Sequence, residues 1–146
     1  MSEQEKRQEW NRQIIAEFRA NEGRVGGPFE GVPLLLLRTR GAKSGEERIN
    51  PLAYLEQDGR HYVFGSNGGR DETPGWCFNV QADPRVIVEV GTRTAAATAV
   101  VLDGAERDRI YAEQVRRYPV FATYEERVTR TIPVVALDLD ASGTES

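Results

Sequence analysis

Apolar residues in the first part of the chain recur with the period of a helix. Trp10, Ile14 and Phe18 follow one another at intervals of four between residues 3 and 21, and Ile15 widens the stripe. This spacing places one apolar face among charged positions. The pattern predicts an N-terminal helix that ends at the glycine-rich segment 22–33, which we expect to form a loop.

Later apolar segments are short and bounded by turn residues, which is typical of strands. They predict six strands, at residues 34–38, 48–55, 60–65, 86–90, 94–102 and 131–139. Between the strands, Thr73 and Pro74 are expected to start one short helix. Asp103 is expected to start another, with Glu106 completing a capping box. Six strands with few helices predict an α+β fold, a small and mostly antiparallel split β-barrel with helices packed on it.

Composition narrows the class of protein. The 146 residues carry a formal net charge of −4 and a pI of about 5.2, which argues against a nucleic-acid partner. Cys77 is the only cysteine, so a reducing compartment is expected. The charged N-terminus lacks a signal segment, and the aliphatic run 34–37 is too short to cross a bilayer. We therefore expect one cytoplasmic domain over 1–146, flexible at 1–8 and 140–146.

The segment from residue 39 to 52 carries the strongest chemical signal. Lys43, one of two lysines, stands beside Ser44 between Gly41 and Gly45 and between two predicted strands. Glycines free the backbone to bend, so the glycine N–H groups, the ammonium and the hydroxyl are predicted to converge on a phosphate. The alternative is a solvated turn in which Lys43 and Arg48 pair with neighbouring glutamates.

Several familiar motifs are missing from the sequence. The segment 41–44 is not a P-loop, because Arg38 stands where the Walker pattern requires glycine. The sequence has no G-x-G-x-x-G fingerprint and no G-x-S-x-G elbow. His61 is the only histidine, which leaves no His-based triad and no His-rich metal site. We expect His61 to be an ordinary strand residue, Cys77 an inert thiol, and the protein to bind no metal.

Three segments together carry a family resemblance. They are 39–52, then 66–69 with 74–79, and 118–134 with its Tyr-Pro-Val-Phe-Ala-Thr-Tyr and Arg-Thr-Ile-Pro-Val runs. In this order, and from Trp10 to Leu139, the chain resembles the deazaflavin-dependent nitroreductase family. These small split-β-barrel proteins are common in actinobacteria and bind coenzyme F-420, a deazaflavin with a phosphodiester and a polyglutamate tail.

The resemblance implies roles for individual residues. Lys43 and Arg48 would hold the cofactor phosphate, and Tyr118, Tyr124 and Ser66 would orient the acceptor as catalytic residues. The resemblance gives as cofactor-binding residues Ala42, Lys43, Ser44, Arg48, Ile49, Asn50, Pro51, Leu52, Ala53, Phe64, Gly65, Ser66, Asn67, Gly75, Trp76, Cys77, Phe78, Asn79 and Phe121.

Some of these positions have a second interpretation. Trp76 either walls the pocket or belongs to the core, and Tyr118 and Tyr124 either face the acceptor along one helical face with Phe121 or pack the helix on the barrel. Arg130 has either a structural or cofactor-adjacent role, or forms a surface salt bridge. Family nitroreductases often carry an aromatic hydroxyl in place of Phe121, which bears on nitro compounds as acceptors.

The implied activity is hydride transfer from reduced coenzyme F-420 to a conjugated acceptor such as a quinone, an enone or a nitroaromatic compound. The alternatives are an FMN-dependent split-barrel oxidoreductase and a deazaflavin carrier without turnover. Some relatives contact membranes through the N-terminal helix, but its narrow stripe here predicts docking on the barrel. Arg12, Arg19 and Arg24 are expected either to face the polyglutamate tail or to be ordinary solvated arginines.

Overall fold

A computed structural model describes residues 2–27 and 31–140. The predicted flexible tail at 140–146 lies outside the described residues from 141 onward. The elements, in chain order, are α1 (Glu3–Ala20), β1 (Leu34–Arg40), β2 (Glu47–Gln57), β3 (Arg60–Phe64), η2 (Asn67–Gly69), α2 (Gly75–Ala82), β4 (Arg85–Val90), β5 (Arg93–Val101), α3 (Gly104–Arg117), α4 (Val120–Arg127) and β6 (Val134–Leu139).

The six strands close into a barrel in the order β1-β2-β3-β6-β5-β4. Every neighbouring pair is antiparallel, including the closing pair of β1 and β4, where Leu37 lies opposite Val88. The last strand, β6, inserts between β3 and β5, so the C-terminal segment completes the barrel. The predicted small antiparallel barrel of the α+β class is therefore confirmed.

Strand β1 shows why its leucines do not alternate with polar residues. Leu35 and Leu37 pack inside the barrel, whereas Leu34 and Leu36 face outward against the first helix. Helix α1 contributes Ile14 and Phe18 to that outer cluster. A strand covered on both faces reads as a continuous apolar run.

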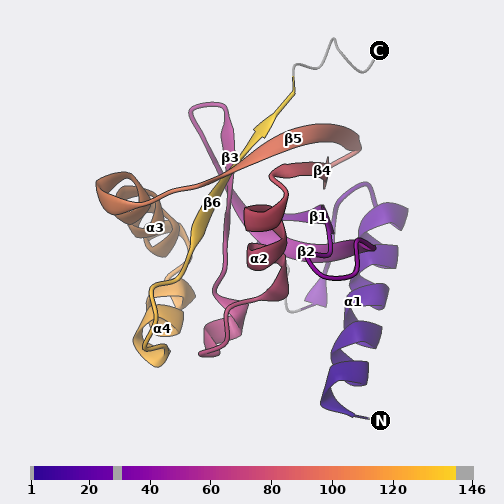
Figure 1. The fold of residues 1–146 in the computed structure, drawn as a ribbon, viewed down its shortest axis with the longest axis horizontal. Helices are drawn as coiled ribbons and strands as arrows, with labels where there is room; N and C mark the ends of the chain where they lie inside the picture. The colour runs from indigo at the N-terminus through magenta and orange to yellow at the C-terminus, as the bar shows by residue number, and fades with distance from the viewer. Residues whose placement is uncertain (1, 28–30, 141–146) are drawn as a thin grey trace.

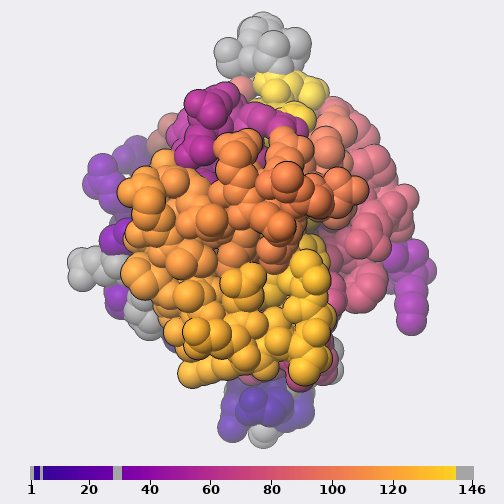
Figure 2. Space-filling model, turned by 90° about the vertical axis from the view of Figure 1, so that its left-hand side faces the viewer, coloured from indigo at the N-terminus to yellow at the C-terminus, as the bar shows by residue number. Residues whose placement is uncertain are grey.

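The helices cover two opposite sides of the barrel (Figure 1). Helix α1 lies along one side, and α3 and α4 lie along the other, with α2 between them. Figure 2 shows α3 and α4, in orange and yellow-orange, as one continuous layer over their face. Ile110 of α3 and Phe121 of α4 belong, together with Ile132, to the buried cluster between this layer and the barrel.

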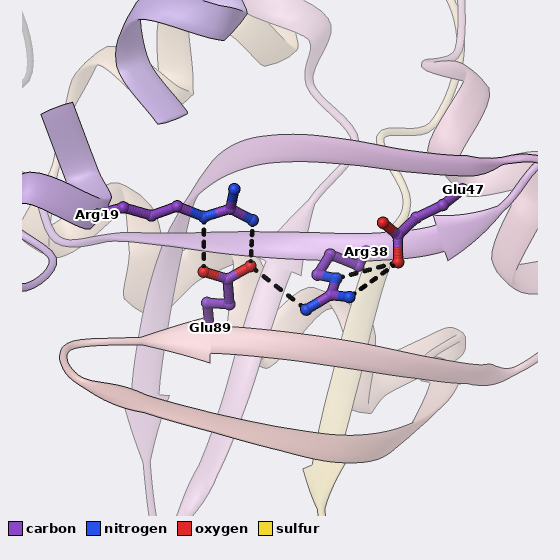
Figure 3. Close-up of polar contacts among 4 residues, drawn as sticks. All are labelled: Arg19, Arg38, Glu47 and Glu89. Atoms are coloured by element: carbon purple, nitrogen blue, oxygen red, sulfur yellow. Dashed lines mark hydrogen bonds and ion pairs between the residues drawn. The ribbon is translucent and has the colours of Figure 1, made fainter. Parts of the chain in front are cut away.

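A row of four charges fixes the C-terminal end of α1 to the barrel (Figure 3). Arg19 donates two hydrogen bonds to Glu89 of β4, at 2.7 and 3.1 Å. Arg38 of β1 lies 3.6 Å from Glu89 and donates to Glu47 of β2 at 3.1 Å. One end of the helix is thereby tied to three strands through alternating charges.

The first helix departs from its predicted apolar stripe. Ile14 and Phe18 are buried as expected, but 45% of Trp10 is exposed. Trp10 lies one turn before Ile14, so the docked stripe is shorter than the sequence pattern indicated. Docking on the barrel, predicted from the narrow stripe, is seen for the second half of the helix. Residues 3–8, predicted to be flexible, belong to α1.

One predicted helix start is wrong by one residue, and the other is confirmed without its predicted capping box. Pro74 is the N-cap of α2, so the helix begins at Gly75 and Thr73 lies outside it. Asp103 is the N-cap of α3, as predicted, but its side chain makes no capping hydrogen bond, so the capping box with Glu106 does not form. The last strand begins at Val134 rather than at residue 131, because the residues between α4 and Val134 form the connection to the strand and do not pair with a neighbouring strand.

Candidate functional site

The turn between β1 and β2 is closed by its own hydrogen bonds. Gly41 N–H donates to the Glu46 carbonyl at 2.7 Å, and Gly45 N–H donates to the Gly41 carbonyl at 2.9 Å. Gly45 adopts a φ of 75°, which favours glycine. The prediction that these two glycine N–H groups bind a phosphate is therefore wrong, because both are used to shape the turn.

The tip of the same turn keeps its donors free. The N–H groups of Lys43 and Ser44 and the Lys43 ammonium have no hydrogen-bond or ion-pair partner among residues 2–27 and 31–140. The Ser44 hydroxyl accepts from Glu46 N–H at 3.1 Å. Three unpaired donors at one tip suit an anionic ligand.

Asn79 of α2 holds this turn in place. Its side-chain oxygen accepts from Ala42 N–H at 3.0 Å, and its amide donates to the Thr39 hydroxyl at 3.0 Å. Both side-chain groups of Asn79 are thus engaged within the protein, and the residue is buried. Asn79 therefore supports the turn from behind, which is a different task from direct contact with a ligand.

A cleft of about 1060 Å³ opens between α1, the β1–β2 turn and α2. Ten residues predicted to bind the cofactor share its wall, and they are Ala42, Lys43, Ser44, Arg48, Ile49, Asn50, Gly75, Trp76, Phe78 and Asn79. The volume is of the size that holds a cofactor or a drug-sized ligand. The structure thus brings together residues from two segments that are about 30 positions apart in the chain.

One wall of the cleft comes from α1 and was only partly foreseen. Gln8, Asn11, Arg12 and Ile15 line it at helical spacing, together with Glu47 from β2. The helical spacing of these residues can be read from the sequence. It does not predict a cleft wall, because polar residues beside an apolar stripe ordinarily face solvent. Of these residues, Arg12 is the one for which the sequence predicts a role in cofactor binding.

The cations of the cleft differ in how strongly they are engaged. Arg48 lies 3.7 Å from Glu46, and both side chains are exposed. Arg12 pairs with Glu9, one turn earlier in α1, at 2.7 Å. Lys43 has no ion pair within the described part of the chain. The predicted alternative, a turn neutralised by its own glutamates, therefore holds for Arg48 and does not hold for Lys43.

The other predicted arginines lie apart from this wall. Arg19 donates both hydrogen bonds to Glu89, so its guanidinium is committed to anchoring α1. Arg24 lines a second hollow on the far end of α1. Of the three arginines predicted to face a polyglutamate tail, Arg12 alone lines the cleft.

The remaining predicted cofactor residues do not line the cleft. They are Pro51, Leu52, Ala53, Phe64, Gly65, Ser66, Asn67, Cys77 and Phe121. Leu52 and Cys77 belong to the barrel interior, and Phe64 and Phe121 belong to the cluster under α3 and α4. Trp76 lines the cleft and is also buried in the core, so both interpretations of this residue apply.

Ser66 lies outside the cleft, next to a residue that contacts α2. Trp76 lines the cleft, and the sulfur of the next residue, Cys77, packs so close to Gly65 that a Cβ there would lie 2.7 Å from it. Ser66 follows Gly65 directly. Burial raises the pKa of the Cys77 thiol to about 12, as expected for an inert packing residue.

The predicted tyrosine face is only partly assembled. Phe121 and Tyr124 share one face of α4, with ring centroids 5.1 Å apart. Tyr118 is the C-cap of α3, so the predicted stack of all three on one helical face is wrong. Phe121 is buried against Phe64, and Tyr111 donates its hydroxyl proton to the Phe121 carbonyl at 2.6 Å. None of the three lines the cleft.

Other classes of site find no support in the described residues. His61 is half-buried and lies 5.4 Å from the ring of Tyr54, as an ordinary strand residue. Within 2–27 and 31–140, no group of His, Cys, Asp or Glu side chains is arranged to hold a metal ion. Among the helices described, none combines the length and apolar character needed to span a bilayer.

Comparison with known proteins identifies the family. The family model described as F420H2-dependent quinone reductase matches residues 10–138. The F420H2-dependent quinone reductase of Mycobacterium tuberculosis is 32% identical over 126 residues, covering 84% of this chain and 85% of the relative.

Two solved structures have a similar fold. One, titled as an F420-H2 dependent reductase, has a TM-score of 0.67 and 38% identity, covering 73% of this chain and 94% of its own. The other, titled as a domain-swapped dimer, has a TM-score of 0.69 and 33% identity, covering 87% and 95%. The resemblance inferred from the three segments is therefore confirmed, and this chain belongs to the F420H2-dependent quinone reductase family.

Proposed function

We propose that the protein is an oxidoreductase that transfers a hydride from reduced coenzyme F-420 to a quinone-type acceptor. The observation that carries this proposal is the cleft of about 1060 Å³ with an unpaired lysine at its rim, in a chain of this family. Ten residues singled out by resemblance line that one cleft.

The donor set of the cleft fits the anionic part of the cofactor. The Lys43 ammonium and the N–H groups of Lys43 and Ser44 are available, and Arg48 is held only by an exposed pair at 3.7 Å. These groups would hold the phosphodiester. Arg12, on the opposite wall, is placed to meet further negative charge. Bound reduced coenzyme F-420 supplies the hydride.

Apolar residues of the cleft suit the flat head of the cofactor. Ile15 and Ile49 line it between α1 and β2, and Trp76 and Phe78 line it on α2. Phe78 exposes 54% of its surface, which is a large exposed fraction for an aromatic side chain on a helix. A bound ring system would cover this surface and exclude water from the cleft.

We assign the acceptor end to Ser66, Tyr118 and Tyr124. The Ser66 hydroxyl has no hydrogen-bond partner among the residues described, and Ser66 directly follows Gly65, which contacts Cys77 of α2. Tyr124 packs against Gly69 in the same loop. These hydroxyls would donate hydrogen bonds that orient the carbonyl oxygens of a quinone and supply a proton. Phe121 supports Tyr124 from the core.

An anaerobic turnover assay tests the proposal. Reduced coenzyme F-420 mixed with the protein and menadione is expected to be oxidised in proportion to protein concentration. The Tyr124→Phe variant removes one hydroxyl and is expected to lower turnover while leaving cofactor affinity unchanged. A cofactor that binds and stays reduced would identify a carrier, and preferential binding of FMN would identify the other split-barrel group. A nitroaromatic acceptor in the same assay tests whether the lack of a hydroxyl at Phe121 matters.

A further inference from the structure

Arg130 makes an unusual set of contacts just before β6. Its guanidinium donates to the carbonyl oxygens of Gly65 at 3.0 Å, Ser66 at 3.3 Å, Arg70 at 2.9 Å and Glu72 at 3.2 Å. Four backbone acceptors from one eight-residue segment thus converge on one side chain. This finding excludes the predicted surface salt bridge, because the partners of Arg130 are carbonyls rather than carboxylates.

The segment that Arg130 gathers is a loop with little regular structure of its own. Asn67, Gly68 and Gly69 all have positive φ, at 50°, 63° and 85°. Glycine adopts positive φ freely, so Gly68 and Gly69 give the loop little conformational preference of its own, and contacts from outside are needed to fix it. Inside the loop, the Asn67 side chain donates to the Glu72 carbonyl at 3.0 Å, which is the same carbonyl that Arg130 holds.

The same loop is joined to α4 and to the segment that follows it. The Asp71 carboxylate accepts from Thr129 N–H at 2.8 Å. A Cβ added at Gly69 would lie 3.2 Å from the ring of Tyr124, so the ring rests on the loop backbone. Residues 65–72 and 124–133 therefore form one unit, with Arg130 at its centre.

This unit carries two of the hydroxyls assigned to the acceptor. Ser66 comes from the loop and Tyr124 from α4. Arg130 donates to the Ser66 carbonyl, and it lies in the segment that directly follows α4. We propose that Arg130 is a positioning residue for the reaction, which sets the Ser66 hydroxyl relative to Tyr124 at the acceptor end of the site. This inference rests on the proposed function.

The chemistry of the side chain explains why arginine is required. A guanidinium presents five N–H donors in a fixed plane, and here Nη2 alone serves three carbonyls while Nη1 serves the fourth. A lysine ammonium keeps the charge but has its three donors on one atom. The Arg130→Lys variant is therefore expected to fold and yet to hold the loop loosely.

The test compares Arg130→Lys and Arg130→Gly with wild type in three measurements. They are the affinity for oxidised coenzyme F-420, kcat with menadione, and amide hydrogen exchange of the 65–72 loop in the protein without cofactor. Loss of positioning is expected to lower kcat by about 100-fold, because misplacement on the scale of 1 Å has that effect. Affinity should stay within about twofold, since the cleft donors are on other elements, and loop exchange should accelerate.

Chemical rescue separates positioning from folding. Free guanidinium at low millimolar concentration is expected to restore part of kcat in Arg130→Gly and to slow loop exchange, and methylammonium is expected to do neither. Arg109→Gly is the matched control, because Arg109 is an exposed arginine on α3. Its kcat should be unchanged, with or without guanidinium.

Two results would overturn the inference alone. The first is an active wild type together with Arg130 variants whose kcat is unchanged. The second is a parallel loss of cofactor affinity and kcat in the variants that guanidinium does not rescue, which would make Arg130 a purely structural residue. An inactive wild type that binds the cofactor would overturn the proposed function, and the role of Arg130 with it. The wild-type assay therefore distinguishes the two failures.

Discussion

Replacing Asn79 by alanine gives the sharpest test of how the cleft is built. The substitution removes two hydrogen bonds of 3.0 Å, one to Ala42 N–H and one to the Thr39 hydroxyl. Each bond contributes about 1 kcal/mol net, and a buried group left without a partner adds about 1 kcal/mol or more. Ala42 is exposed and regains water, whereas Thr39 is 3% exposed and does not.

The free energy of unfolding should therefore fall by about 2–3 kcal/mol in Asn79→Ala. For a domain of this length that corresponds to a Tm lowered by about 5–10 °C. Urea unfolding of wild type and variant measures the difference directly. The β1–β2 turn should also loosen, and cofactor affinity should fall because the turn that carries Lys43 and Ser44 is then held less firmly.

Asn79→Asp is the matched control for this substitution. A carboxylate can accept from Ala42 N–H with one oxygen and from the Thr39 hydroxyl with the other, so the turn keeps its support. The variant should be more stable than Asn79→Ala and yet bind an anionic ligand more weakly than wild type, because it adds negative charge to the cleft. A stability of Asn79→Ala within about 0.5 kcal/mol of wild type would refute the reasoning.

Three further predictions follow from the charges and the thiol. Glu89→Gln leaves Arg19 without its carboxylate and should lower the free energy of unfolding by about 1–2 kcal/mol in urea titrations, whereas Glu9→Gln, which breaks an exposed pair, should change it by less than about 0.5 kcal/mol. Burial raises the Cys77 pKa to about 12, so iodoacetamide at pH 8 should modify the thiol only after denaturant is added; fast labelling of the native protein would be contrary evidence. Hydrogen bonds from two arginines lower the Glu113 pKa to about 2, so their stabilising effect is present above pH 4.5 and lost as pH falls toward 2, and carboxyl NMR titration should show that midpoint.

The sequence predicts the barrel well because its signals are local. Each strand is a short apolar segment between turn residues, and β1, covered on both faces, reads as four consecutive leucines. The ends of elements were less predictable. Whether Pro74 is the N-cap of α2 or its first helical residue depends on the backbone conformation before it. Whether Trp10 is buried depends on how far the barrel extends beside α1.

The candidate site also has a part that the sequence predicts and a part that it does not. Lys43 and its turn were identified from residue types alone, and the structure places them in a cleft. The sequence could not show that the glycine N–H groups are used within the turn, that Asn79 supports the turn from α2, or that one face of α1 lines the cleft. These are contacts between segments distant in the chain. The role of Arg130 belongs to the same class, because its four carbonyl partners lie about 60 positions away.

The two lysines of the chain allow a direct measurement of the central claim. Titrations of wild type, Lys43→Ala and Lys6→Ala with oxidised coenzyme F-420, each repeated with FMN, compare a cleft lysine with one that lies outside it. A charge-assisted hydrogen bond contributes about 1.5–3 kcal/mol, so Lys43→Ala should weaken binding of coenzyme F-420 by about 10- to 100-fold. Lys6→Ala should bind like wild type, and FMN should bind more weakly than coenzyme F-420. Equal affinities for the two lysine variants would contradict the claim that the cleft holds the anionic part of the cofactor.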